Sequence, residues 1–402
     1  MSIHKVKFCE GVPHRPAVEI PAYCRPEAAA AARRYHQDLP GYEPTPLHCL
    51  PGLAQVAKVG RVVVKDEALR FNLNAFKVLG ASYAIARLLA QQLQLDGDQL
   101  NWEQLASLTK ERLGQITLVT ATDGNHGRAV AWAAEQLGQR AVVYLPQGAA
   151  PSRIEAIAGH GAEVIVTDSN YDDAVRLAAA QAAANGWFLV QDTAVPGYED
   201  IPAWIMQGYT TIAAESWEQM QVLGLRPTHI FLQAGVGSLA ASQVGYWQGQ
   251  LAEHPPKFVV MEPEQAACFY LSAKQKDGQP HAVGGNLETI MAGLSCGEPN
   301  PLAWPLLRDY TTAFASCPDY VAAYGMRIFG NPWAGGERIT AGESGAVGAG
   351  LLALLAQPTY QAWRQRLGLT QDSVVLLINS EGATDPVNYQ AIVWDGKYPL
   401  TE

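Results

Sequence analysis

The sequence lacks several features that mark whole classes of protein. Lysine and arginine number 28 against 38 aspartates and glutamates, and no basic block interrupts the net charge of −10. Nucleic acids and anionic membranes need clustered positive charge, so neither is an expected partner. The first sixteen residues hold no long apolar run, and the alanine-rich stretch that follows is too short to cross a bilayer. We therefore expect neither a secretory signal nor a membrane span.

Paired cysteine motifs are also missing. The six cysteines have no CxxC spacing, so no metal site is expected, and reduced thiols in a cytoplasmic protein are the prediction. Charged residues are scarce at 16%, whereas apolar residues reach 48% of the 402 positions. This composition predicts a large core divided over two or three domains.

Short apolar runs rich in Val, Ile and Leu alternate with alanine-rich helical patterns such as 129–137 and 172–184. The expected strands are 61–65, 116–121, 141–145, 163–167, 187–191, 228–233, 257–262 and 373–379. This alternation predicts an α/β fold with right-handed βαβ units and open, mostly parallel sheets. Residues 91–114 are expected to form a polar helical insertion at the surface. Residues 284–305 are rich in Gly, Pro and Asn, and a loop of that length is usually functional.

A glycine-rich segment, QAGVGSLA at 233–240, follows one expected strand and opens a helix. Its backbone N–H groups and the helix dipole are suited to binding a phosphate. The same segment fits a dinucleotide fingerprint, because Gly235, Gly237 and Ala240 match GxGxxA and Glu262 ends the next strand. From this segment alone, a nicotinamide-dependent oxidoreductase remains an alternative.

Lys77 lies in the apolar start of a helix, within NLNAFKVLG. Poor solvation lowers the pKa of a lysine amine, and a neutral amine can form a Schiff base with a carbonyl compound. A lysine that extends to solvent along an apolar surface is the alternative interpretation.

Two further polar turns follow expected strands. The turn TDGNHG brings Thr122, Asp123, Asn125 and His126 together, where N–H groups can receive a carboxylate. Helix capping explains one such residue but not the crowding of several. Near the C-terminus, Ser380 ends the run LLINS, where its hydroxyl can face a ring nitrogen.

Taken together, these segments resemble the fold-type II pyridoxal 5'-phosphate (PLP) enzymes, the tryptophan synthase β-subunit family. That family has a lysine at a helix start, a polar turn, a glycine-rich phosphate loop and a C-terminal Ser/Thr/Cys, in this order. The resemblance extends from about residue 41 to 397 and favours PLP over a dinucleotide. It implies that Lys77 carries the cofactor, that Asn125 bonds its O3′, and that Ser380 faces its ring nitrogen. The implied phosphate cradle is Gly235, Val236, Gly237 and Ser238.

Within that family the similarity is greatest to members that eliminate ammonia from 2,3-diaminopropionate. It lies in segments such as RFNLNAFKVLGASYAIA, TIMAGLSCGEPNPL and AGESGAVGAG. Asp123 stands where most of the family has serine, and those members have an aspartate. The resemblance thus implies that Asp123 and Lys77 take protons from the D and L isomers. Asp192, at the end of the expected strand 187–191, is a second acidic candidate for the β-amine, and a helix cap before Gly197 is the alternative interpretation. Thr122 and His126 are the other candidate substrate contacts.

The resemblance also implies two α/β domains with the cofactor in the cleft between them, and a homodimer. The large domain is expected to comprise 1–75 and 196–402, and the small domain 76–195. The alternatives are a serine or threonine dehydratase of the same fold, which needs no acid for a β-ammonium, and a PLP carrier without activity.

Overall fold

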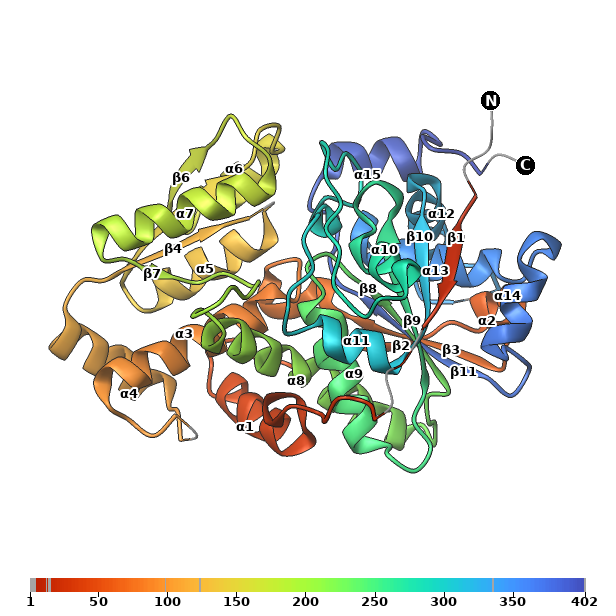
Figure 1. The fold of residues 1–402 in the computed structure, drawn as a ribbon, viewed down its shortest axis with the longest axis horizontal. Helices are drawn as coiled ribbons and strands as arrows, with labels where there is room; N and C mark the ends of the chain where they lie inside the picture. The colour runs from red at the N-terminus through yellow and green to blue at the C-terminus, as the bar shows by residue number, and fades with distance from the viewer. Residues whose placement is uncertain are drawn as a thin grey trace.

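The computed structural model describes residues 5–11, 13, 16–97, 99–122, 124–334 and 336–400. Its strands form two sheets (Figure 1). The larger sheet has seven strands in the order β1-β10-β9-β8-β11-β3-β2, and the smaller has four in the order β6-β5-β4-β7. The strands are β1 (Lys7–Glu10), β2 (Leu47–Cys49), β3 (Arg61–Asp66), β4 (Thr117–Ala121), β5 (Arg140–Leu145), β6 (Glu163–Val166), β7 (Phe188–Leu189), β8 (His229–Gln233), β9 (Lys257–Pro263), β10 (Thr311–Cys317) and β11 (Val374–Asn379).

Helices cover both sheets and connect them. They are α1 (Pro26–Gln37), α2 (Pro51–Ala57), α3 (Lys77–Leu93), α4 (Trp102–Leu108), α5 (Asn125–Gln136), α6 (Pro151–Ala158), α7 (Tyr171–Asn185), α8 (Asp200–Val222), α9 (Ser238–Gln250), α10 (Cys268–Gln275), α11 (Trp304–Tyr310), α12 (Asp319–Gly330), α13 (Glu343–Leu354), α14 (Gln361–Leu367) and α15 (Pro386–Val393). Helix α5 packs on the small sheet and on α3, α3 packs on α8, and α8 packs on α9, which lies against the large sheet. These packed helices join the two sheets (Figure 1).

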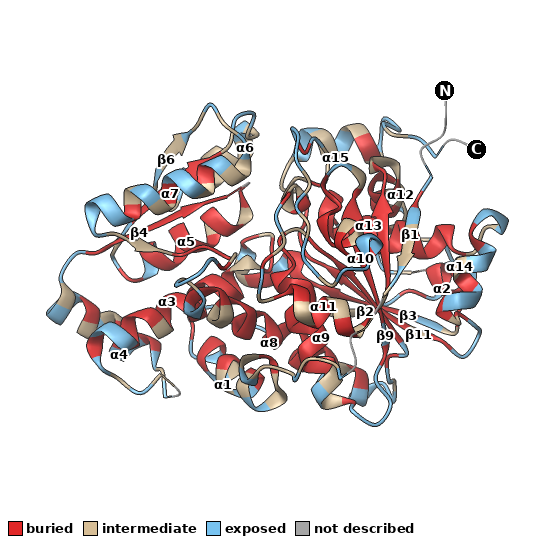
Figure 2. Cartoon of the chain, viewed as in Figure 1, coloured by how far each residue is buried: buried red, intermediate tan, exposed pale blue. Residues whose placement is uncertain are grey.

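The prediction of mostly parallel sheets is confirmed. Every pairing in the small sheet is parallel, and in the large sheet only β1 with β10 and β2 with β3 are antiparallel. The central strands are buried on both faces, as expected of strands covered by helices on each side (Figure 2). The last strand, β11, inserts between β8 and β3, so the C-terminal part of the chain completes a sheet begun near residue 61.

Three strands were missed by the sequence prediction, and each has a physical reason. The edge strands β1 and β2 are short and only partly buried, so their composition has no apolar run. Strand β10, TTAFASC, is buried but lacks Val and Ile, because small side chains pack beneath its neighbouring helices. Residues 91–114 were predicted to form a polar insertion at the surface. The structure differs in part, because Trp102 and Leu105 of this stretch are buried in the core.

The strands divide between the sheets in the way that the predicted domains require. Strands from 117 to 189 form the small sheet, and strands before 67 and after 228 form the large sheet. The domain boundaries after residues 75 and 195 stay a prediction. Among the described helices, none combines the length and the apolar character of a membrane span.

Candidate active site

The predicted site residues that the structure describes line one cavity. The walls come from the start of α3, the ends of β4, β8 and β11, and the loop after α10. The cavity is lined by the predicted residues Lys77, Thr122, Asn125, His126, Asp192, Gly235, Val236, Gly237, Ser238 and Ser380. Asp123 lies outside the described residues.

Lys77 is the first residue of α3 and follows an unusual backbone segment. Phe71, Asn72 and Asn74 have φ values of 50°, 57° and 62°, which are costly for residues other than glycine. Two backbone bonds link this segment to the turn after β11, from Gly382 N to Asn74 O (2.9 Å) and from Phe76 N to Ser380 O (3.2 Å). The lysine and Ser380 are therefore held in fixed relation.

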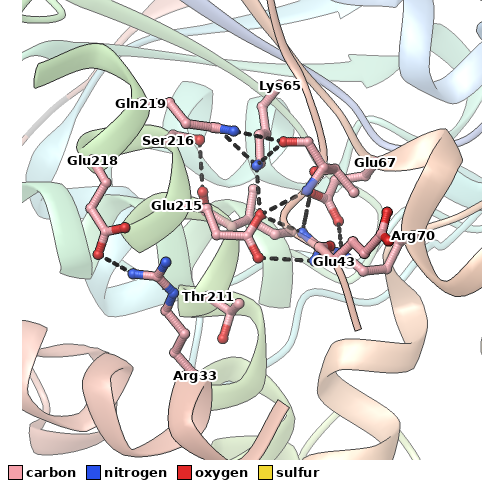
Figure 3. Close-up of polar contacts among 12 residues, drawn as sticks. Arg33, Glu43, Lys65, Glu67, Arg70, Thr211, Glu215, Ser216, Glu218 and Gln219 are labelled. Carbon is pink, nitrogen blue, oxygen red and sulfur yellow. Dashed lines mark hydrogen bonds and ion pairs between the residues drawn. The ribbon is translucent and has the colours of Figure 1, made fainter. Parts of the chain in front are cut away.

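A buried ion cluster holds Arg70, the residue that precedes this segment (Figure 3). Arg70 donates to Glu67 at 2.8 and 2.9 Å and to Glu215 of α8 at 2.8 and 2.9 Å. Lys65 of β3 donates to the Glu215 Oε2 atom at 2.5 Å, and all four side chains have no exposed surface. Because two positive charges face two negative ones, the cluster is neutral, and loss of any member leaves a buried unpaired charge.

The Lys77 amine donates a hydrogen bond to Asp192 at 2.6 Å. The lysine side chain is 15% exposed and the aspartate 3%, so the pair is nearly withdrawn from water. Burial alone would raise the pKa of Asp192, but the charge of Lys77 holds it below its usual value. The Tyr171 hydroxyl lies 3.5 Å from the other carboxylate oxygen. Asp192 is thus an ionised acid whose present partner is Lys77, and it does not cap a helix.

Ser238 and Asn300, two residues from the part of the chain that forms the large sheet, hold the backbone of Asp192 in place. The Ser238 hydroxyl donates to the Asp192 carbonyl at 2.7 Å and accepts from the Asn300 amide at 2.9 Å. The hydroxyl proton of Ser238 is therefore already used, which leaves its backbone N–H for a phosphate. Asn300 is fully buried and was missed by sequence reasoning. Its position in the long loop at 284–305 was the signal available.

The glycine loop has the form of an anion site. Among described residues, the backbone N–H groups of residues 235–238, which lead into α9, have no acceptor. Gly237 has a φ of +94°, and a Cβ there would lie 2.4 Å from the Phe269 ring. Only glycine meets both constraints. Four unpaired N–H groups at a helix N-terminus fit a phosphate group.

Asn125, the first residue of α5, donates from Nδ2 to Glu381 at 2.6 Å. Glu381 also accepts the backbone N–H of Ser344 at the start of α13 (3.2 Å). Glu381 is 2% exposed and lines the cavity next to Ser380. Sequence reasoning considered Ser380 and passed over its neighbour, which orients the Asn125 amide.

Three buried polar atoms in the cavity wall have no hydrogen-bond partner among described residues: His126 Nδ1, Tyr209 Oη and Ser344 Oγ. His126 Nε2 lies 2.8 Å from the Val190 carbonyl, which can only accept, so Nε2 carries the hydrogen and Nδ1 is a bare acceptor. Burial lowers the pKa of His126, which keeps the ring neutral. Unpaired buried polar atoms are costly, and their gathering in one cavity fits a polar ligand.

Glu262, the acid that the dinucleotide alternative requires, binds backbone groups away from the cavity. Glu262 is fully buried, and its two oxygens accept the backbone N–H groups of Phe269 (2.8 Å) and Tyr270 (2.7 Å). It therefore caps α10 and does not line the cavity. A dinucleotide at the glycine loop would have no acid for its ribose.

Comparison with known proteins agrees with this geometry. Residues 39–380 match the family described as pyridoxal-phosphate dependent enzyme. The chain is 51% identical over 373 residues to diaminopropionate ammonia-lyase of Escherichia coli (strain K12), covering 92% of each chain. Two crystal structures of the Escherichia coli enzyme cover 99% of both chains at 46% identity. The complex with an aminoacrylate-PLP azomethine reaction intermediate has a TM-score of 0.90, and the complex with D-serine 0.91. The chain therefore belongs to the pyridoxal-phosphate-dependent enzymes and, among them, to the diaminopropionate ammonia-lyase family.

Proposed function

We propose that the protein eliminates ammonia from D- and L-2,3-diaminopropionate, giving 2-aminoacrylate, which water converts to pyruvate and a second ammonia. The observation that carries the proposal is the Lys77–Asp192 pair. It places an amine that can anchor PLP beside a buried carboxylate that can bind a second ammonium group. A hydroxy amino acid would not require that carboxylate.

The residues at the two ends of the cavity suit PLP. The N–H groups of 235–238 would hold its phosphate, Asn125 its O3′ and Ser380 its ring nitrogen. When bound, the cofactor withdraws electrons from the bonds at Cα of the substrate. A serine hydroxyl at the ring nitrogen cannot protonate it as a carboxylic acid would, which favours elimination over transamination.

Lys77 and Asp192 have different tasks in the reaction. Lys77, once released from the cofactor, takes the Cα proton of the L isomer. Asp192 accepts a bond from the Lys77 ammonium in the structure. With Lys77 on the cofactor, this carboxylate would bind the β-ammonium of the substrate, because both donors are ammonium groups of the same charge. The β-amine then departs as neutral ammonia, with its positive charge balanced until the C–N bond breaks.

The polar turn after β4 supplies the other contacts. Asp123 is proposed as the base for the D isomer. His126 presents the bare Nδ1 acceptor to a substrate N–H group, as its neutral ring requires. The Thr122 hydroxyl accepts the Gly124 N–H at 2.9 Å and lines the cavity, where it is a candidate contact of the substrate carboxylate. A cytoplasmic homodimer is the proposed form of the enzyme, on the family resemblance.

The test is a substrate comparison with purified, PLP-loaded protein. We expect pyruvate and two ammonia per 2,3-diaminopropionate consumed, with a kcat/KM well above those for serine and threonine. A higher kcat/KM for serine or threonine would assign the dehydratase function instead. A yellow protein that forms no 2-oxo acid from any of the three would indicate a PLP carrier.

A further inference from the structure

Tyr209 is a cavity residue to which the reaction above gives no role. It belongs to α8, which crosses α3 at close range through two glycines. A Cβ on Gly208 would lie 2.4 Å from the Leu79 carbonyl oxygen, and one on Gly80 would lie 2.4 Å from the Tyr209 ring. The tyrosine ring therefore occupies the space that a side chain at Gly80 would fill.

This packing places the ring beside Lys77. Residues three apart in a helix share a face, so Gly80 and Lys77 lie on one side of α3. Phe76 provides a second reference point, because its ring is 4.7 Å from the Tyr209 ring and 5.6 Å from the Lys77 amine. Tyr209, Lys77 and Asp192 all line the same cavity.

The Tyr209 hydroxyl is buried and has no hydrogen-bond partner among described residues. Burial raises the pKa of the phenol, which keeps its proton. The hydroxyl therefore remains a hydrogen-bond donor. An unpaired buried donor is costly, so we expect the Tyr209 hydroxyl to find a hydrogen-bond acceptor during the reaction.

The Lys77 amine can be that acceptor only in one of its two protonation states. While Lys77 donates to Asp192 at 2.6 Å, it is an ammonium with no lone pair to accept a bond. When the α-amino group of the substrate replaces Lys77 on the cofactor, the lysine would be released as an amine, which must be neutral to act as a base. A neutral amine has a lone pair, and the nearby phenol is a donor suited to it.

We propose that Tyr209 is a positioning residue that donates a hydrogen bond to the neutral amine of Lys77 and so stabilises the form that acts as a base. This inference rests on the proposed role of Lys77. The phenol keeps its proton throughout, and the Cα proton goes to the lysine. A donor to the neutral amine lowers its pKa, whereas the Asp192 carboxylate raises it.

The test compares Tyr209→Phe with Tyr389→Phe. Both hydroxyls lack described partners, but Tyr389 lies in α15, outside the cavity lining. We expect Tyr209→Phe to lower kcat for L-2,3-diaminopropionate about tenfold and to move the acidic limb of its pH profile up by about one unit. Tyr389→Phe should leave both quantities unchanged.

A second measurement follows Lys77 without the cofactor. In Asp192→Asn apoenzyme, the pH dependence of reductive methylation at Lys77, read by mass spectrometry, gives the pKa of its amine. Adding Tyr209→Phe should raise this pKa by about one unit. Equal pKa values with and without the hydroxyl, or an unshifted pH profile in Tyr209→Phe, would overturn the inference. Full activity in Lys77→Ala would instead overturn the proposed function on which it rests.

Discussion

The Lys77 amine and the Asp192 carboxylate lie 2.6 Å apart in a cavity that also contains a phosphate-type glycine loop. The lysine opens α3, and the aspartate follows β7 of the small sheet. In the proposed function, this pair connects the anchor of the cofactor to the group that receives the second amine of the substrate.

Asp192→Asn should lower kcat/KM for 2,3-diaminopropionate about 100-fold or more, because asparagine can neither balance the β-ammonium nor exchange its proton. The matched control is Asp38→Asn, which alters a hydrogen-bonded aspartate outside the cavity lining and should retain full activity. Steady-state assays of pyruvate release compare the two. Wild-type kcat/KM in Asp192→Asn would exclude this carboxylate from the reaction.

Asp123→Asn should reduce activity on the D isomer far more than on the L isomer. Asparagine preserves size and hydrogen bonding but cannot act as a base, and loss of a general base costs about 10²–10⁴ in rate. The L isomer retains Lys77. The measurement is kcat/KM for each isomer. Equal losses would make Asp123 a residue of binding or of the leaving group for both isomers.

Gly237→Val should weaken PLP binding strongly. The left-handed φ of +94° and the contact with Phe269 leave no room for a side chain, so the loop must move away from the phosphate. Gly284→Val is the control, because a Cβ there meets no atom within 4 Å. Equilibrium titration of both apoenzymes with PLP gives the affinities. Similar affinities for both variants would remove the loop from cofactor binding.

Glu343 predicts a pH dependence of stability. Burial and the charge of Glu381 raise the pKa of Glu343 from 4.5 to about 7. Between these values the folded chain binds a proton that the unfolded chain releases, so stability falls as pH rises through this window. The cost is of order 3–4 kcal/mol across this window at about 1.4 kcal/mol per pH unit. Glu343→Gln should remove it, so that the variant gains Tm over the wild type at pH 8 but not at pH 4.5. Parallel Tm curves would contradict the assignment.

The sequence predicted the strands with long Val-rich and Ile-rich runs well, because burial on both faces leaves an unbroken apolar signal. It missed β10, whose small residues give no such signal. Ten predicted site residues lie in one cavity because most of them follow the carboxyl ends of parallel strands in the two sheets. Asn300, Glu381 and Tyr209 were not predicted to belong to the site. Asn300 and Glu381 reach the site through hydrogen bonds to residues more than a hundred positions away in the sequence. Tyr209 reaches it because two glycines let α8 cross α3 closely.

The most direct test of the account is to locate the lysine that carries PLP. The yellow holoenzyme is reduced with borohydride, digested and analysed by mass spectrometry. We expect the reduced cofactor on the peptide that contains Lys77, together with loss of both the adduct and nearly all pyruvate formation in Lys77→Ala. An adduct on another lysine, or wild-type absorbance and turnover in Lys77→Ala, would contradict it.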